Sequence, residues 1–252
     1  MSAKDSIHKW FEALQPEISP LLENIGIPQQ KPDHSPVTEA DRRIEQLLRE
    51  KIQADFPEDG IIGEELPPHQ PQALRQWIID PIDGTRAMIA GFPTFTTLIA
   101  LLVKERPEAA GIFQPITGEL WLGDGKTATY NGQTARIEVV DSLEDAVFTT
   151  TSPLLFRESD KPRIEYFMHH CNAYQLGGDA YAYGKLACGR VHLIIESGMK
   201  PYDFLPLVPI VQGAGGLITD WEGNPLSLHS TGDVIAAATP QLHQRAIALL
   251  NS

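Results

Sequence analysis

The sequence has few cysteines, few basic residues and no long apolar run. Only Cys171 and Cys188 occur in 252 residues, and neither belongs to a Cys-x-x-Cys pair. Two cysteines cannot frame a disulfide-rich fold, so we expect both to be buried thiols in a reducing compartment. The longest strongly apolar run, Leu98–Val103, has six residues, which is far too short to span a bilayer.

The shortage of basic residues limits the partners that the chain can bind. There are 20 Lys and Arg against 33 Asp and Glu, so the net charge is −13. Nucleic acids and anionic membranes are bound by clustered Lys and Arg, and this balance argues against both. The segment Met1–Trp10 lacks the apolar core of a signal peptide, and we expect a cytoplasmic protein.

Motifs of several enzyme classes are also missing. The sequence has no Gly-x-Gly-x-x-Gly after a strand, no Walker loop, no His-Glu-x-x-His and no Gly-x-Ser-x-Gly elbow,. The glycine-rich stretch Gly213–Gly216 is better interpreted as the end of a helix. His169 and His170 lie on an expected helix and are interpreted as surface residues rather than metal ligands.

The spacing of the apolar residues predicts an α/β protein. We expect a first helix over about Lys4–Ile25, a polar loop over Lys31–Pro36, and a second helix from Thr38, where Thr38 and Asp41 resemble a capping box. Strands are expected at 61–62, 77–79, 94–103, 109–114, 119–122, 127–130, 146–150, 173–176, 191–196, 217–219 and 234–237. Further helices are expected near 161–169 and 179–188 and from 201 and 240.

Alternation of this kind indicates a layered α/β structure. We place a seam near residues 139–146. It divides the chain into an N-terminal α+β subdomain, residues 1–140, and a C-terminal α/β subdomain, residues 141–252.

Three acidic clusters stand at expected strand ends or helix starts. They are Gly63-Glu64-Glu65, Asp80-Pro81-Ile82-Asp83-Gly84-Thr85 and Pro201-Tyr202-Asp203. Each has an ordinary structural explanation, since Asp80 can end a strand and Asp83 can cap a helix. Taken together they favour a shared site, because neighbouring strand ends of an α/β fold converge on one edge.

The second cluster combines carboxylates with a phosphate-binding pattern. We expect the strand to end at Asp80, and Pro81 to stiffen a bend that presents Asp80 and Asp83 together. Gly84 permits close backbone approach, and a helix starting at Thr85 would direct N–H groups toward a phosphate. Two carboxylates would repel that phosphate unless divalent cations lay between them. Mg²⁺ fits, because it takes oxygen ligands and bridges carboxylates to phosphate.

The order and spacing of these motifs resemble the inositol-monophosphatase-like phosphatases, which are Mg²⁺-dependent and lithium-sensitive. The resemblance extends over nearly the whole chain. It implies the layered α/β/α/β/α sandwich of that family, a homodimer, and a small phosphate ester as substrate. It also implies two or three Mg²⁺ ions, ligated by Glu64, Asp80, the carbonyl of Ile82, Asp83 and Asp203.

The resemblance also implies how the reaction is catalysed, without a covalent intermediate. Glu64 and a Thr85–Asp41 pair would activate and orient a metal-bound water, and the backbone N–H groups of Gly84 and Thr85 would hold the phosphate. By pattern alone, Asp41 is instead an exposed acid in the first turn of a helix. Lys31 lies in the loop where the family has a metal-binding segment, although a solvated lysine is the simpler interpretation.

The groups around the leaving alcohol decide the substrate. Alignment with inositol-type members places Asp179 and Glu196 there, although Asp179 could cap a helix and Glu196 could be an exposed strand-end acid. An acidic pocket beside a phosphate suits a substrate that carries an amine. The full set of expected substrate contacts is Ile82, Asp83, Gly84, Thr85, Arg86, Asp179 and Glu196.

Three stretches are similar to the histidinol-phosphate phosphatase branch of the family: 83–87, 178–184 and 198–205. Gln175 departs from this branch, which often has a basic residue there. Arg86 could bind phosphate or form a salt bridge with a neighbouring acid. Tyr181, Tyr183 and Phe204 are expected to pack in the core, although one could flank an imidazole ring.

We therefore expect an enzyme that hydrolyses L-histidinol phosphate to L-histidinol and phosphate, as in histidine biosynthesis. The first alternative is the same chemistry on inositol 1-phosphate or other small phosphate esters. The second is a catalytically silent family member that acts as a regulatory partner.

Overall fold

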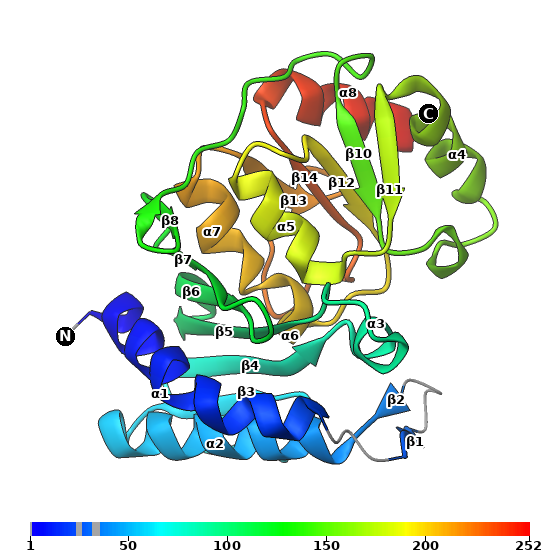
Figure 1. Cartoon of the computed structure of the whole chain (residues 1–252). Coiled ribbons are helices and arrows are strands. Elements are labelled where there is room, and N and C mark those ends of the chain that lie inside the picture. The colour runs from blue at the N-terminus through cyan, green and yellow to red at the C-terminus, as the bar shows by residue number, and fades with distance from the viewer. Residues whose placement is uncertain (1, 24–26, 32–35) are drawn as a thin grey trace.

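The computed structural model of the chain describes residues 2–23, 27–31 and 36–252. It contains two large β-sheets and helices between and outside them (Figure 1). The expected end of the first helix at Ile25 lies outside the described residues, as does most of the expected loop over 31–36. Pro36 itself belongs to a short strand, because β1 (Gln29–Gln30) pairs with β2 (Pro36–Val37) in a small antiparallel sheet.

The first large sheet has seven strands in the order β3-β4-β5-β6-β7-β8-β9. Its strands are β3 (Gly60–Gly63), β4 (Arg75–Asp83), β5 (Thr96–Val103), β6 (Arg106–Gln114), β7 (Glu119–Gly123), β8 (Ala128–Tyr130) and β9 (Gln133–Thr134). Only the β3–β4 pair is parallel. One face is covered by α1 (Ala3–Glu23) and α2 (Glu39–Asp55), and the other by α5 (Asp179–Ala187) and α7 (Leu207–Gly213).

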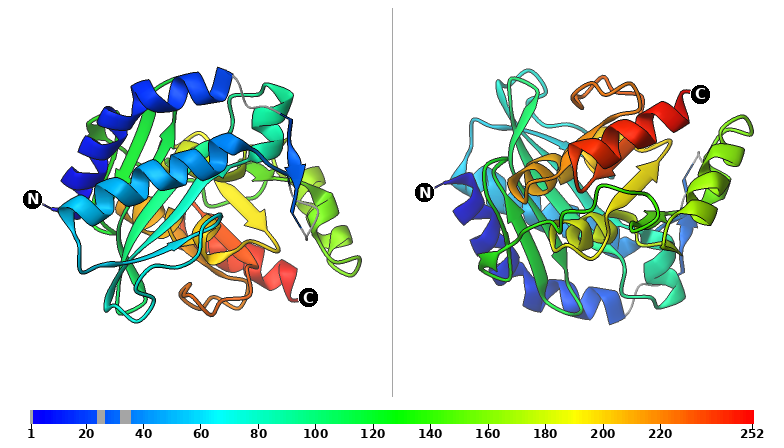
Figure 2. Two further views of the ribbon diagram at one scale, coloured as in Figure 1. Left: turned by 90° about the horizontal axis from the view of Figure 1, so that it is seen from below. Right: turned by 90° about the horizontal axis from the view of Figure 1, so that it is seen from above.

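The second large sheet has five strands in the order β11-β10-β12-β14-β13. They are β10 (Val147–Thr150), β11 (Ala173–Leu176), β12 (Leu193–Glu196), β13 (Leu217–Asp220) and β14 (Val234–Ala237). Helices α4 (Lys161–His170) and α8 (Pro240–Leu250) lie on its outer side, opposite α5 and α7 (Figures 1 and 2). Short helices complete the chain: α3 (Thr85–Ala90), η1 (Pro153–Leu155) and α6 (Pro201–Phe204).

The resulting α/β/α/β/α order of layers confirms the expected fold. Three clusters of buried side chains fill the spaces between the layers. In β5, Leu98, Ala100 and Leu102 face α5 and α7, whereas Ile99 and Leu101 face α1 and α2. A strand with helices on both faces has no polar side, which explains its continuous apolar run.

The boundary near residue 140 stays a prediction. The cluster between the two sheets joins Ile78 and Leu98 of the N-terminal half to Ile194 and Val234 of the C-terminal half. The two halves therefore share one core.

Most expected elements are present, but three details were wrong. Strand β4 does not end at Asp80 but continues to Asp83, with a register shift against β5 between these residues. The helix expected from Pro201 is divided into α6 and α7, because Pro206 has no N–H to continue the helical ladder,. Both cysteines are free but only half-buried.

Two further expectations were correct. Gly213 ends α7, and Gly215 follows with φ of +102°, as expected for the end of a helix,. His169 and His170 lie exposed on α4. Within the described ranges, no helix combines the length and the apolar character needed to span a bilayer.

Helix α5 packs tightly on the first sheet, and Gly184 makes this possible. A Cβ at this position would lie 2.7 Å from the indole ring of Trp121 in β7. Gly184→Ala would gain about 1 kcal/mol of helix propensity, but overpacking a core costs about 1–3 kcal/mol. We expect the substitution to lower the melting temperature by a few degrees, measured by thermal unfolding. A variant that melts higher than the natural chain would show that α5 can shift away from β7 without cost.

Candidate active site

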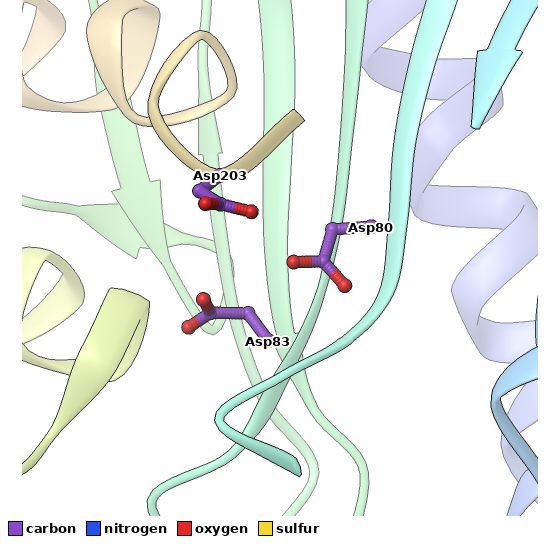
Figure 3. Close-up of side chains that lie close together, drawn as sticks. All are labelled: Asp80, Asp83 and Asp203. Carbon is purple, nitrogen blue, oxygen red and sulfur yellow. The ribbon is translucent and has the colours of Figure 1, made fainter. Parts of the chain in front are cut away.

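Three aspartates gather where β4 meets the start of α6. Asp80 and Asp83 come from β4 and Asp203 from α6, and each offers a carboxylate oxygen within 4.8 Å of the others (Figure 3). Residues three apart on a regular strand point to opposite faces. The register shift in β4 changes this alternation and brings both aspartates to one side,.

Backbone donors hold each of these carboxylates in place. Ile82 donates its N–H to Asp80 Oδ1 at 3.0 Å, and Ala180 at the start of α5 donates to Asp83 Oδ2 at 2.6 Å. Asp203 Oδ2 accepts from the N–H of Lys200 at 2.7 Å. The carboxylates are therefore pre-oriented toward one another.

The electrostatics of the three aspartates fit a cation. Burial, and then the neighbouring carboxylates, raise the pKa values of Asp80 and Asp83 well above the ordinary range. Burial also raises the pKa of Asp203 to about 7. A site made of one buried and two partly buried carboxylates suits a hard divalent cation, which would relieve their repulsion,.

Glu64 lies beside the three aspartates at the end of β3. Its carboxylate adds to the effect of burial in raising the Asp80 pKa. Lys31 Nζ lies 2.5 Å from Glu64 Oε1 and also contacts the Glu65 carboxylate. Burial alone would lower the Lys31 pKa, but these two hydrogen bonds outweigh it and the pKa is raised. Lys31 is thus not the solvated lysine that its sequence context suggested.

Asp41 is buried and not the exposed acid that its position in the first turn suggested. Its side chain is 1% exposed and accepts hydrogen bonds from Thr38 N at 2.8 Å and Thr38 Oγ1 at 2.6 Å. The first of these bonds belongs to the expected capping box of α2. The Thr85 hydroxyl donates to Ile82 O at 3.0 Å. No described hydrogen bond joins Thr85 to Asp41, so their pairing stays a prediction.

Gly84 forms the turn between β4 and α3. Its φ of +84° lies in the left-handed region, which glycine adopts without strain,. A Cβ there would lie 3.1 Å from Asp179 Oδ2. The expected phosphate-binding turn is therefore adjacent to the side chain that we expect to contact the alcohol.

A pocket of about 190 Å³ opens beside the aspartates. Its lining includes Asp83, Asp179, Tyr183, Glu196 and Asp203, together with Thr151, Leu155, Ala180, Ser197, Gly198 and Met199. The structure thus brings both acids of the expected alcohol site into the same pocket as two of the three clustered aspartates.

Asp179 and Glu196 do not have the ordinary roles that their positions allowed. The N-cap of α5 is Gly178, and Asp179 is the first helical residue. Glu196 is 4% exposed, because β12 is the central strand of its sheet. Glu196 Oε1 accepts from Thr151 N at 2.7 Å and Thr151 Oγ1 at 2.9 Å. Burial nevertheless raises the Glu196 pKa to about 8.

The remaining expected side chains differ in their placement. Arg86 is exposed and lies near enough to Asp179 to favour its charged form, although burial raises the Asp179 pKa overall. Tyr183 is fully buried at the pocket, and its hydroxyl lies 3.8 Å from Met199 Sδ. Tyr181 donates to Glu119 instead, and Phe204 is in the core.

Sequence reasoning missed Thr151 and the pair Glu45–Arg49. Thr151 directly follows β10 and donates to Glu196 in the neighbouring strand β12, and the only sequence signal was the polar run Thr149-Thr150-Thr151. Glu45 and Arg49 look like a solvated pair at i and i+4 of a helix. Both are buried against the segment that follows Glu64.

The buried Glu196 makes stability depend on pH. Its folded pKa of about 8 exceeds the model-compound value of 4.5, so between these pH values the folded state holds a proton that the unfolded state has released. The free energy of unfolding therefore falls as pH rises through this window. Glu196→Gln removes this titration, and we expect a shallower fall between about pH 5 and pH 8 in denaturant titrations. An unchanged slope would contradict the raised pKa.

Comparison with known proteins identifies the family. The model of the inositol monophosphatase family matches residues 4–252. The bifunctional phosphatase IMPL2 of Arabidopsis thaliana is 40% identical over 227 residues, which cover 86% of this chain and 66% of that protein. A histidinol-phosphatase of Chlorobaculum parvum is 37% identical over 209 residues, covering 82% of this chain and 80% of that one.

Two further matches are not named histidinol-phosphatase. The Nus factor SuhB of Vibrio cholerae is 30% identical, over 83% of this chain and 80% of that protein. A solved structure of an inositol monophosphatase from Zymomonas mobilis superposes with a TM-score of 0.89 at 40% identity and covers 100% of both chains. The chain belongs to the inositol monophosphatase family, and this phosphatase family supports a phosphoric monoester hydrolase.

Proposed function

We propose that this chain is a Mg²⁺-dependent phosphomonoesterase that hydrolyses L-histidinol phosphate to L-histidinol and phosphate. The observation that carries the proposal is the pocket that joins Asp83 and Asp203 to two further acids, the partly buried Asp179 and the buried Glu196. The first pair suits a cation and phosphate, and the second pair suits an amine. The relative named histidinol-phosphatase supports this substrate.

The metal is proposed to be held by carboxylates and one carbonyl. The ligands would be Glu64, Asp80, the carbonyl of Ile82, Asp83 and Asp203. Bound Mg²⁺ would lower the pKa of a coordinated water molecule and neutralise negative charge on the phosphoryl oxygens. The N–H groups of Gly84 and Thr85 hold the phosphate, and the exposed Arg86 adds a positive charge for it. Asp41 and Thr85 orient the attacking water.

The alcohol half of the substrate is proposed to occupy the rest of the pocket. Asp179 and Glu196 face the ammonium group, and charge attraction from it favours the ionised form of Glu196. Leu155 and Met199 give this pocket an apolar side, which suits the carbon atoms of an imidazole ring. Inositol phosphate has neither an ammonium nor an aromatic ring, so these two features favour histidinol phosphate.

Two other functions are supported by particular relatives. The Zymomonas mobilis structure, at 40% identity, supports inositol phosphate as the substrate. The Vibrio cholerae Nus factor supports a regulatory role in place of catalysis. Every position proposed as a metal ligand carries a carboxylate or a backbone carbonyl in this chain, so the groups needed for metal-dependent catalysis are present. We therefore rank catalysis first. A homodimer and lithium sensitivity remain predictions from the family resemblance, and a cytoplasmic location remains a prediction from the sequence.

One prediction from the proposed function concerns the metal and Asp83. Phosphate release should stop in EDTA and return with Mg²⁺. Asp83→Asn should lower kcat/KM at least about a hundredfold. Losing this carboxylate should cost several kcal/mol of charge stabilisation in the transition state, and each loss of about 1.4 kcal/mol slows the reaction about tenfold. The exposed Asp141→Asn is a matched control and should retain full activity. Substantial turnover by a folded Asp83→Asn chain would contradict the metal assignment.

Another prediction from the proposed function concerns which phosphate ester is the preferred substrate. With Mg²⁺ present, histidinol phosphate should be hydrolysed with a higher kcat/KM than inositol 1-phosphate in side-by-side assays. Asp179→Asn should reduce kcat/KM for histidinol phosphate far more than for a neutral phosphate ester. Equal losses would remove the amine argument, and better turnover of inositol 1-phosphate by the natural chain would overturn the proposed substrate.

A further inference from the structure

A buried ion pair lies on the side of α2 that faces the Glu64 segment. Glu45 is fully buried and Arg49 is 9% exposed. Glu45 Oε1 lies 2.8 Å from Arg49 Nε and 2.7 Å from Arg49 Nη2. Removing two charges from water is costly, and an ion pair of this kind is often no more stable than apolar residues of similar size. Its stabilising effect alone therefore does not explain why it is there.

The pair has partners in the chain directly after Glu64. Glu45 Oε2 accepts from the N–H of Glu65 at 2.7 Å, and Oε1 accepts from the N–H of Leu66 at 3.2 Å. Arg49 donates to the carbonyls of Leu66 and Pro67, each at 3.0 Å. This segment has no regular secondary structure, so its backbone groups need side-chain partners. The pair satisfies four of them.

The residue before Glu64 is also fitted to Glu45. A Cβ at Gly63 would overlap the Glu45 carboxylate. Glu64 itself donates its N–H to Ile79 O in β4 at 3.2 Å, next to Asp80. Hydrogen bonds therefore hold the backbone at two adjacent residues, to β4 at Glu64 and to Glu45 at Glu65, and Gly63 leaves room for the Glu45 carboxylate.

We propose that Glu45 and Arg49 are positioning residues for the cation site. They hold the irregular segment after β3, so that the Glu64 carboxylate stays beside Asp80. Apolar residues could fill the same volume but could not bind these four backbone groups. The inference rests on the proposed role of Glu64 as a metal ligand. Groups hydrogen-bonded directly to a ligating side chain commonly contribute about 10–100-fold to metal affinity or activity, and we take the lower end of that range for this backbone support.

The test is direct binding of Mn²⁺, an oxygen-liganded substitute for Mg²⁺, measured by electron paramagnetic resonance. Glu45→Gln keeps the shape of the side chain. Both carboxylate oxygens of Glu45 accept hydrogen bonds from N–H groups, so in the variant the amide nitrogen, itself a donor, would have to face one of these N–H groups. We expect the dissociation constant to rise about tenfold or more. Glu50→Gln is the matched control on the same helix, because Glu50 is exposed and bonds only to side chains in the described structure. It should bind Mn²⁺ within about twofold of the natural chain.

A double variant separates positioning from stability. Glu45→Met with Arg49→Met replaces the ion pair by apolar groups, which is often neutral for stability. We expect it to bind Mn²⁺ at least about tenfold more weakly, whatever its melting temperature. Arg49→Lys keeps the charge but loses the forked donors, and should weaken binding in the same direction by a smaller factor.

Two outcomes distinguish the failure of this inference from the failure of the proposed function. If Glu64→Gln weakens Mn²⁺ binding and folded Glu45→Gln does not, the positioning role is wrong and the metal site stands. If Glu64→Gln leaves binding unchanged, Glu64 is not a ligand and both assignments fail. Should Glu45→Gln not fold, Arg49→Lys with natural Mn²⁺ affinity would equally overturn the positioning role.

Discussion

Repulsion between buried carboxylates is the constraint on which the site depends. Asp80, Asp83 and Asp203 offer oxygens within 4.8 Å of one another, with Asp80 buried and the other two partly buried. Burial is the largest cause of their raised pKa values, and neighbouring carboxylates add to it. The scaffold must hold them against this repulsion, and in the described structure it does so mainly with backbone N–H donors.

The layered fold supplies those donors from several elements. The donors are Ile82 at the irregularity of β4, Ala180 at the start of α5 and Lys200 before α6. Each of these elements packs against the cluster between the sheets, so the positions of the three carboxylates depend on one core. The net charge of −13 is therefore compatible with an anionic substrate, since a bound cation would reverse the local charge,.

Much of this arrangement could be predicted from the sequence. Strand and helix positions follow from apolar spacing, and the acids Glu64, Asp80, Asp83 and Asp203 stand out because they cluster at expected strand ends and helix starts. The register shift in β4 could not be predicted, because it depends on pairing with β5. The burial of Glu196 depends on the central place of β12, which local sequence does not reveal.

Glu45 and Arg49 illustrate the same limit. On a helix, a Glu and an Arg four residues apart have the pattern of a solvated surface pair. Only the packing of α2 against the segment after β3 shows that they bind its backbone. Residues that act through backbone contacts leave little trace in a single sequence, whereas clustered acids are conspicuous. The sequence thus revealed the groups that we propose to touch the cation, but not those that we propose to orient them.

The most direct test of the central claim is anomalous scattering from crystals of the natural chain soaked in Mn²⁺. The account predicts a strong anomalous peak within coordination distance of oxygens from Asp80, Asp83 and Asp203, about 2.0–2.3 Å away, as expected for a small divalent cation with oxygen ligands. Anomalous peaks found only elsewhere on the molecule would contradict the account. The absence of any anomalous peak at millimolar Mn²⁺ would also contradict it.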